Sequence, residues 1–175
     1  VLWAVAVVVI VVDQITKQWA LAALAEIGAT DIVVAARRHA GPGRAATAAH
    51  RMDLDVSLLT WRPGEAASDG AVVEALTQAD LIVSTLPAGA ADALGPSLAS
   101  ALERGEGRAR GVMLDVVYAS WPTPLAATWM ATGRHAVPGW LMLLHQAVPQ
   151  VALMTGLTPP IAPMREALEN AVADR

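Results

Sequence analysis

Short apolar runs and longer Ala-rich stretches alternate along most of this sequence. The short runs are rich in Val, Ile and Leu and are bounded by Gly, Pro or polar residues, which is typical of buried strands. The longer stretches have the length of crossover helices. This order predicts an α/β domain with a doubly wound parallel sheet and helices on both faces. Its expected strands are residues 31–37, 56–61, 79–87, 111–118 and 134–139.

The expected helices fill the gaps between these strands. Gly28 is a natural end for the first helix, because glycine readily takes the left-handed conformation that follows a helix. Residues 39–50 (HAGPGRAATAAH) have no regular apolar spacing and are predicted to form a flexible loop. The other predicted helices cover residues 69–79, 90–105 and 123–133, and two more lie between 140 and 169.

The first twenty residues follow a different pattern, with twelve apolar residues in a row. As a helix this run would be only about 18 Å long, at about 1.5 Å per residue, against about 30 Å for the hydrocarbon core of a membrane. Two alternatives follow. The run contacts a membrane as a helix, with Asp13 and Lys17 paired on one face, or residues 5–12 form a Val-rich strand of the sheet.

Composition excludes several classes of function. The net charge of −4 and the pI near 5.5 give no basic field, so we expect no nucleic-acid partner. Cysteine is absent, which excludes disulfides, thiolate metal sites and a cysteine nucleophile, and is compatible with the cytoplasmic location that we expect. The histidines have no metal-ligand spacing, so no metal site is predicted.

Candidate ligand-binding residues lie where the predicted strands end, because doubly wound sheets bind ligands at the carboxyl ends of their strands. Arg37 and Arg38 end the strand at which an arginine would accept the 2′-phosphate of NADP, so NADP is expected rather than NAD. A pair of solvated arginines is the alternative. Residues 84–87 make a turn that either lines a cofactor or only connects a strand to a helix. Tyr118 either contacts a polar ligand or lies on the rim.

From about Leu21 to the end, the motifs of the chain resemble the C-terminal half of shikimate dehydrogenases. The likeness implies a Rossmann-like fold and NADPH-dependent reduction of 3-dehydroshikimate to shikimate, a step of the chorismate pathway and aromatic amino acid biosynthesis. The small-molecule substrate would be shikimate or 3-dehydroshikimate. The residues that carry the likeness are DVVYASWPTPL (115–125), GWLMLLHQAVPQVALMTG (139–156) and PPIAPMREAL (159–168), with AAR (35–37) and STLP (84–87) in the expected order.

This resemblance also implies roles for particular residues. On the cofactor side, the resemblance implies that Arg37 binds the 2′-phosphate, with Arg38 beside it. It also implies that the turn of Ser84, Thr85 and Pro87 lies along the cofactor. Nearer the reacting centre, the resemblance implies that the backbone at Gly139 and Met142 lies beside the nicotinamide. It also implies that Tyr118 lies near the substrate and the nicotinamide, and that Gln146 donates a hydrogen bond to the substrate.

Two features of that family are missing from the sequence. The substrate domain, which supplies the family's catalytic Lys and Asp, has no counterpart, so no catalytic residue is assigned and we expect this chain alone to be inactive. The first strand and the glycine-rich loop are replaced by VVIVVDQITKQWA (8–20), with no glycine before Gly28. Because that loop lets the backbone approach a pyrophosphate, weak cofactor binding is expected. We divide the chain into residues 1–20 and a cofactor-binding domain of residues 21–175.

The N-terminal segment resembles a different family. An apolar run that ends in Asp13, Gln14 and Lys17 is similar to the first transmembrane helix of lipoprotein signal peptidases. No further apolar span or aspartate motif of that family follows, so peptidase activity is not expected. Membrane contact through residues 1–20 stays open, and with it the alternative of a membrane-anchored, non-catalytic remnant. Since the sequence begins with Val1 rather than Met, a fragment or a gene fusion also stays open, as does the oligomeric state.

Overall fold

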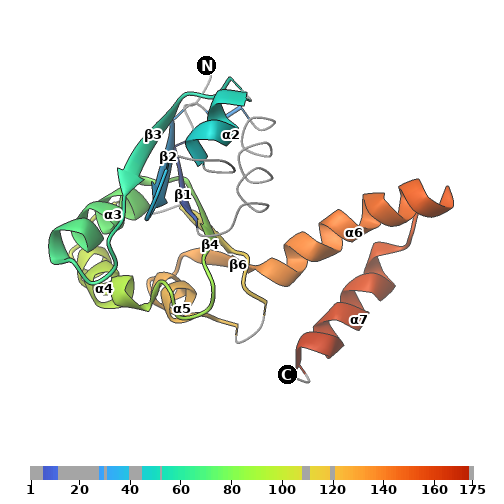
Figure 1. The fold of residues 1–175 in the computed structure, drawn as a ribbon. Helices are drawn as coiled ribbons and strands as arrows, with labels where there is room; N and C mark the ends of the chain where they lie inside the picture. The colour runs from blue at the N-terminus through green and yellow to red at the C-terminus, as the bar shows by residue number, and fades with distance from the viewer. Residues whose placement is uncertain are drawn as a thin grey trace, which may run out of the picture.

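One six-stranded parallel sheet organises the protein, in the order β3-β2-β1-β4-β5-β6 (Figure 1). The computed structural model describes residues 6–11, 28–29, 31–39, 45–51, 53–107, 111–118 and 121–173. The strands are β1 (Ala6–Val11), β2 (Asp31–Ala36), β3 (Val56–Thr60), β4 (Leu81–Thr85), β5 (Val112–Asp115) and β6 (His135–Pro138). Every neighbouring pair is parallel. This strand order is that of a Rossmann fold, so the predicted α/β class is confirmed.

The N-terminal apolar run supplies the central strand. β1 pairs with β2 on one side and with β4 on the other, so that Val8 is in register with both Val33 and Ile82. A run of β-branched residues suits this position, because a central parallel strand has helices or other chain over both of its faces. The apolar segment therefore takes the place of the first strand. The domain boundary proposed after residue 20 lies outside the described residues and stays a prediction.

Helices cover the two faces according to the direction of the crossovers. Right-handed connections put the helices of the β1-to-β3 half on one face and those of the β3-to-β6 half on the other. Accordingly α3, α4 and α5 pack against one another, while α2 lies on the opposite side of the sheet (Figure 1). The helices are α2 (Ala45–Arg51), α3 (Ala66–Gln78), η1 (Asp92–Leu94), α4 (Gly95–Glu103), α5 (Pro124–Met130), α6 (Gly139–Thr155) and α7 (Ile161–Ala173).

Two details differ from the sequence prediction. Residues Ala45–Arg51, expected to be part of a loop, form the short helix α2, which buries Ala49. Its small side chains give a weak periodic signal but cost little entropy in a helix. The single helix expected around Pro96 is instead η1 followed by α4, because Pro96 occupies the first turn of α4, where a missing N–H does no harm.

The main hydrophobic core lies between the sheet and the α3–α5 layer. Its largest fully buried members include Leu76, Ile82, Leu98, Met113 and Trp129. By contrast, α6 and α7 contact each other and extend away from the sheet, and α7 has no buried residue (Figure 1). Within the described ranges, no helix combines the length and apolar character needed to cross a membrane.

Candidate functional site

The carboxyl edge of the sheet brings most of the predicted site residues to one side of the molecule. All six strands run parallel, so the residues that follow them emerge at the same edge. The chain crosses from the β3 side to β4 past the central strand β1, which is where a doubly wound sheet leaves a crevice. The glycine-free turn after β1, with Asp13, and the possible second phosphate contact Arg44 lie outside the described residues.

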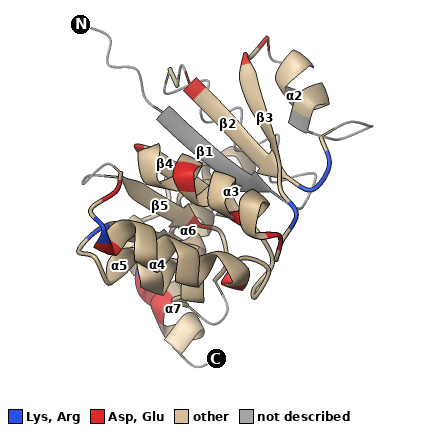
Figure 2. Ribbon diagram, turned by 90° about the vertical axis from the view of Figure 1, so that its left-hand side faces the viewer, with Lys and Arg blue, Asp and Glu red and all other residues tan. Residues whose placement is uncertain are grey.

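The basic part of this edge lies after β2 and β3. Arg37 and Arg38 follow β2 directly and are exposed, as their predicted role requires. The backbone N–H of Trp61 donates to the carbonyl of Ala36 at 2.9 Å, so the end of β3 lies beside the two arginines. Figure 2 shows basic residues following both strands. The third arginine of this region is Arg62, which sequence reasoning missed although the strand-end rule, applied to the strand over 56–61, could have found it.

His39 adds an unsatisfied polar group to the same region. It follows Arg38, and its two ring nitrogens are buried without a hydrogen-bond partner. Buried polar atoms in native proteins nearly always have a partner, so an orphan of this kind calls for a bound group or solvent. The spacing of the histidines in the sequence gives His39 no predicted role, and no group of residues in the described part of the chain could hold a metal ion.

The turn after β4 is well packed. Ser84 and Thr85 are buried and Pro87 is exposed. The carbonyl of Ser84 accepts a hydrogen bond from the backbone N–H of Val116 at 2.9 Å, which ties this turn to the segment after β5. The predicted cofactor-lining turn therefore lies at the carboxyl edge, next to the loop that carries Tyr118.

Asp115 organises the loop after β5. It is 2% exposed. The hydroxyl of Thr123 donates to its Oδ2 at 2.6 Å, and the N–H of Val117 donates to its Oδ1 at 3.2 Å. Burial raises the pKa of Asp115, while hydrogen bonds from Thr123, Val117 and Ser84 lower it. Asp115 therefore holds a backbone amide of this loop in place through its contact with Val117.

Thr123 connects this network to the next helix. Its Oγ1 accepts from the backbone N–H of Ala126 at 3.2 Å and so caps α5. Beside Ser84, Asp115 and Thr123 lies a cavity of about 10 Å³, which is room for about one water molecule. This cluster therefore positions the loop and does not line a substrate pocket.

The nicotinamide-side candidates converge where β5 and β6 end. Tyr118 is 46% exposed at the rim. The backbone N–H of Gly139 donates to the carbonyl of Val117 at 3.4 Å, and a Cβ on Gly139 would overlap the backbone of Val116. Met142 and Gln146 follow on α6 at helical spacing and are partly exposed. The structure thus brings Tyr118 close to Gly139, with Met142 and Gln146 on the adjoining helix.

Known proteins match this arrangement. Residues 139–169 match the model of the Shikimate 5′-dehydrogenase C-terminal domain. The shikimate dehydrogenase (NADP(+)) of Acidiphilium cryptum is 49% identical over 59 residues, which are 34% of this chain and 20% of that protein. The corresponding protein of Bartonella quintana is 36% identical over 91 residues, 51% of this chain and 31% of that protein. The match therefore spans less than a third of either relative.

Solved structures match over almost the whole chain. Mycobacterium tuberculosis shikimate dehydrogenase is 33% identical with a TM-score of 0.72, and the match covers 98% of this chain and 58% of that one. Thermus thermophilus shikimate 5-dehydrogenase, in complex with NADP(H) and shikimate, is 25% identical with a TM-score of 0.63, and the match covers 94% and 54%. The sheet order, the carboxyl-edge site and these matches show that the body of the chain is similar to the C-terminal domain of shikimate dehydrogenases.

Proposed function

We propose that this domain binds NADP(H) and supplies the cofactor site for reduction of 3-dehydroshikimate to shikimate. The basic end of β2 is the observation that carries the proposal. Arg37 and Arg38 are exposed directly after the second strand of a Rossmann-ordered sheet, where a guanidinium fork matches a ribose 2′-phosphate. The matched relatives named as NADP(+) enzymes support the same cofactor.

The residues around this edge fit a phosphorylated dinucleotide. The two ring nitrogens of His39 are buried and unpartnered, and a phosphate beside Arg38 would give its ring N–H an acceptor. Three arginines that emerge from two neighbouring strands supply the positive charge that a phosphate dianion needs. At the other end of the site, Gly139 keeps the backbone of α6 close to the loop after β5.

When bound, NADPH supplies the hydride of the reaction. On the protein side, we assign the turn of Ser84, Thr85 and Pro87 to the cofactor, and the backbone at Gly139 and Met142 to the nicotinamide. Tyr118 and Gln146 are assigned to substrate, because Tyr118 is exposed on the loop after β5 and Gln146 is partly exposed on the adjoining helix α6. Small polar ligands are oriented by a few such groups around a mainly apolar surface.

We further propose that this chain by itself binds the cofactor but does not turn over substrate. The only lysine of the sequence is Lys17, in the N-terminal segment. Asp115 is buried and engaged by three hydrogen-bond donors, so it cannot exchange a proton with a substrate at the rim. The described residues around Tyr118 therefore include no equivalent of the catalytic Lys and Asp implied by the family resemblance. Affinity for the cofactor is expected to be modest, because no glycine precedes Gly28 to let the backbone approach the pyrophosphate.

Titration calorimetry of the purified chain tests the proposal. NADPH should bind more tightly than NADH, and Arg37→Ala should weaken NADPH binding by roughly tenfold while leaving NADH unchanged, as expected for the loss of a charged hydrogen bond. Arg104→Ala is a matched control, since Arg104 is an exposed arginine on the loop after α4 and pairs only with Glu106 among the described residues. A folded chain that binds neither cofactor would overturn the proposal.

A further inference from the structure

A basic residue from β3 points to a phosphate site built from two strands. β2 and β3 are parallel neighbours with Ala36 in register with Thr60, and Trp61 continues the pairing through its hydrogen bond to Ala36. Adjacent strands lie about 4.8 Å apart. Arg62 therefore leaves the sheet within one side-chain length of Arg38, although the two are far apart in the sequence.

Buried contacts fix the start of the loop that carries Arg62. The indole Nε1 of Trp61 donates to Oδ1 of Asp69 at 2.7 Å, and both side chains are buried. The other carboxylate oxygen of Asp69 accepts from the backbone N–H of Gly64 at 3.0 Å. With Asp69 bonded to Trp61 on one side and to Gly64 on the other, the backbone of Arg62 is held in place at the edge of the sheet, which is what a preorganised ligand contact requires.

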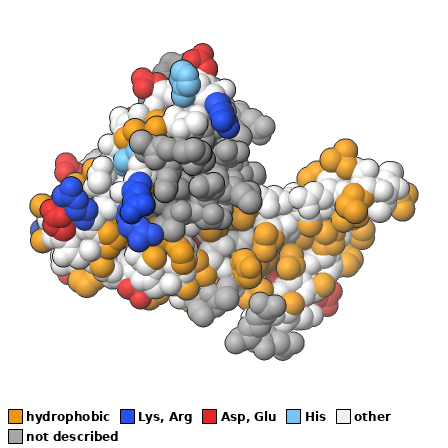
Figure 3. Space-filling model, in the orientation of Figure 1, with side chains coloured by type: hydrophobic (Ala, Val, Ile, Leu, Met, Phe, Trp, Pro, Cys, Tyr) orange, Lys and Arg blue, Asp and Glu red, His pale blue; other side chains and the backbone are white. Residues whose placement is uncertain are grey.

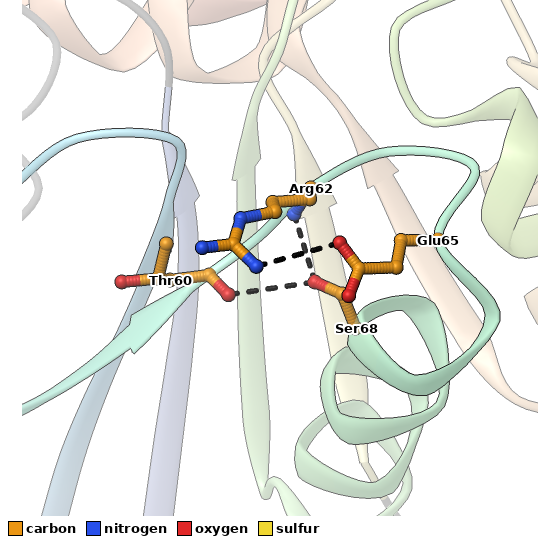
Figure 4. Close-up of polar contacts among 4 residues, drawn as sticks. All are labelled: Thr60, Arg62, Glu65 and Ser68. Carbon is orange, nitrogen blue, oxygen red and sulfur yellow. Dashed lines mark hydrogen bonds and ion pairs between the residues drawn. The ribbon is translucent and has the colours of Figure 1, made fainter.

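Ser68 adds a further constraint on the backbone of Arg62. The N–H of Arg62 donates to Ser68 Oγ at 2.8 Å, and that hydroxyl donates to the carbonyl of Thr60 at 3.4 Å (Figure 4). One hydroxyl on α3 thus bridges the last residue of β3 and the arginine. The backbone is fixed while the side chain stays exposed.

The guanidinium of Arg62 has N–H donors available for a ligand. Its Nη1 lies 3.5 Å from Oε2 of Glu65, and the two side chains are 72% and 53% exposed. Exposed ion pairs of this length contribute little because solvent screens them. Arg carries five N–H donors, and this contact engages one nitrogen (Figure 4). A phosphate can therefore replace Glu65 as the partner.

We propose that Arg62 and His39 complete, with Arg37 and Arg38, a binding site for a phosphate monoester dianion, and that Arg62 determines selectivity for the 2′-phosphorylated ribose. His39 contributes two buried nitrogens that lack a partner. Arg62 contributes a guanidinium whose backbone anchor is the hydrogen bond to Ser68 and whose side-chain partner is the exposed carboxylate of Glu65. Glu65 competes with the phosphate for Arg62. The inference rests on the proposed function and names further residues of that site.

The test uses adenosine 2′,5′-bisphosphate and 5′-AMP as calorimetric probes on the full chain. These probes differ by the 2′-phosphate and need neither the nicotinamide nor a complete pyrophosphate site. The wild type should prefer the bisphosphate. Arg62→Ala should weaken bisphosphate binding by about tenfold or more, as follows from the loss of one charged hydrogen bond, and leave 5′-AMP unchanged. Glu65→Gln should tighten it a few-fold by removing the competitor.

Further variants separate charge from geometry. Arg62→Lys should keep only part of the affinity, because an ammonium lacks the planar fork. His39→Ala should weaken the bisphosphate, whereas the Arg104→Ala control should not. Inorganic phosphate serves as a competitor. Displacement only at much higher concentration than the bisphosphate supports a nucleotide site, and equal affinity would overturn the nucleotide assignment. Unchanged far-UV circular dichroism of each variant shows that the chain is folded.

Failure of this inference and failure of the proposed function give different results. If the wild type prefers the bisphosphate and Arg62→Ala binds it equally well, Arg62 has no role and the proposed function stands. If the bisphosphate binds with the predicted dependence on Arg62 but NADPH binds no better than the bisphosphate, the anion site stands and the nicotinamide half of the proposed function fails. If the wild type does not distinguish the two probes, both are overturned.

Discussion

Two groups of apolar helices in this molecule have opposite relations to solvent. In the α3–α5 layer, Leu98 and Trp129 have no exposed surface, whereas on the α6–α7 pair Leu153 is 87% and Met154 86% exposed. Figure 3 shows hydrophobic side chains gathered along the surface of that pair. Both groups have apolar sequences, so composition does not decide which is buried.

Connectivity explains the difference. Each helix of the α3–α5 layer is a crossover that must return to start the next parallel strand, and it therefore lies against the sheet. α6 and α7 follow β6 and are not crossovers between described strands of the sheet. Folding stability is therefore concentrated in the crossover layer, while α6 carries Met142 and Gln146, two of the residues that we propose for the ligand site.

The largest loss of stability is expected when a large buried side chain is removed from the α3–α5 layer. Trp129→Ala removes a fully buried indole whose Nε1 donates to the carbonyl of His135 at 3.1 Å. Loss of a buried tryptophan costs about 3–5 kcal/mol in cores. The measurement is the free energy of unfolding from urea denaturation. Leu153→Ala on α6 is the matched control and should change it by less than about 0.5 kcal/mol, as at exposed sites. Equal losses in the two variants would contradict the comparison.

A smaller effect is expected at the junction between the two regions. Gly139 begins α6, and a Cβ there would overlap the backbone of Val116. Gly139→Ala should lower the free energy of unfolding by about 1–3 kcal/mol, the usual cost of overpacking. Gly70→Ala is the control, because Gly70 lies within α3 with open space around it, and alanine in a helix interior should stabilise by about 0.5–1 kcal/mol. Urea denaturation should therefore show a lower free energy of unfolding for Gly139→Ala and a higher one for Gly70→Ala.

Most of the fold could be predicted from local sequence patterns, that is, from apolar runs and the turn residues that bound them. The Val-rich runs of β2 to β6 are bounded by turn residues, and Gly156 ends α6 in the left-handed conformation that its position predicts. Helix α2 was not predicted, because its alanines do not produce the alternation of apolar and polar positions that marks an amphipathic helix. Whether the N-terminal run was strand or membrane helix could not be decided locally, since only pairing with β2 and β4 distinguishes them.

The candidate site was predictable only in part. Arg37, Arg38 and Tyr118 follow from the strand-end rule, because each is adjacent in sequence to the strand that positions it. The same rule, applied to the strand over 56–61, marks Arg62 as a strand-end residue, but its place beside Arg37 and Arg38 depends on a hydrogen bond between two strand ends. The candidacy of His39 depends on the burial of its nitrogens. Neither fact is visible in a single sequence, since both arise from residues that are distant along the chain.

The smallest effect concerns pH and the buried carboxyl of Asp115. Burial raises its pKa in the folded state above the unfolded value, which is about 3.9. The protonated form is thus favoured by folding, and the contribution of Asp115 to stability is greatest in acid and falls as pH rises above the unfolded pKa.

Asp115→Asn cannot ionise, so its stability relative to the wild type should increase between pH 4 and pH 7 in urea denaturation. Thr123→Val should show the opposite difference. This substitution removes the 2.6 Å hydrogen bond that lowers the pKa of Asp115, so the variant should lose stability relative to the wild type over the same interval. Parallel curves for the wild type and Asp115→Asn would show that Asp115 titrates alike in the folded and unfolded chain, and that its hydrogen bonds fully offset its burial.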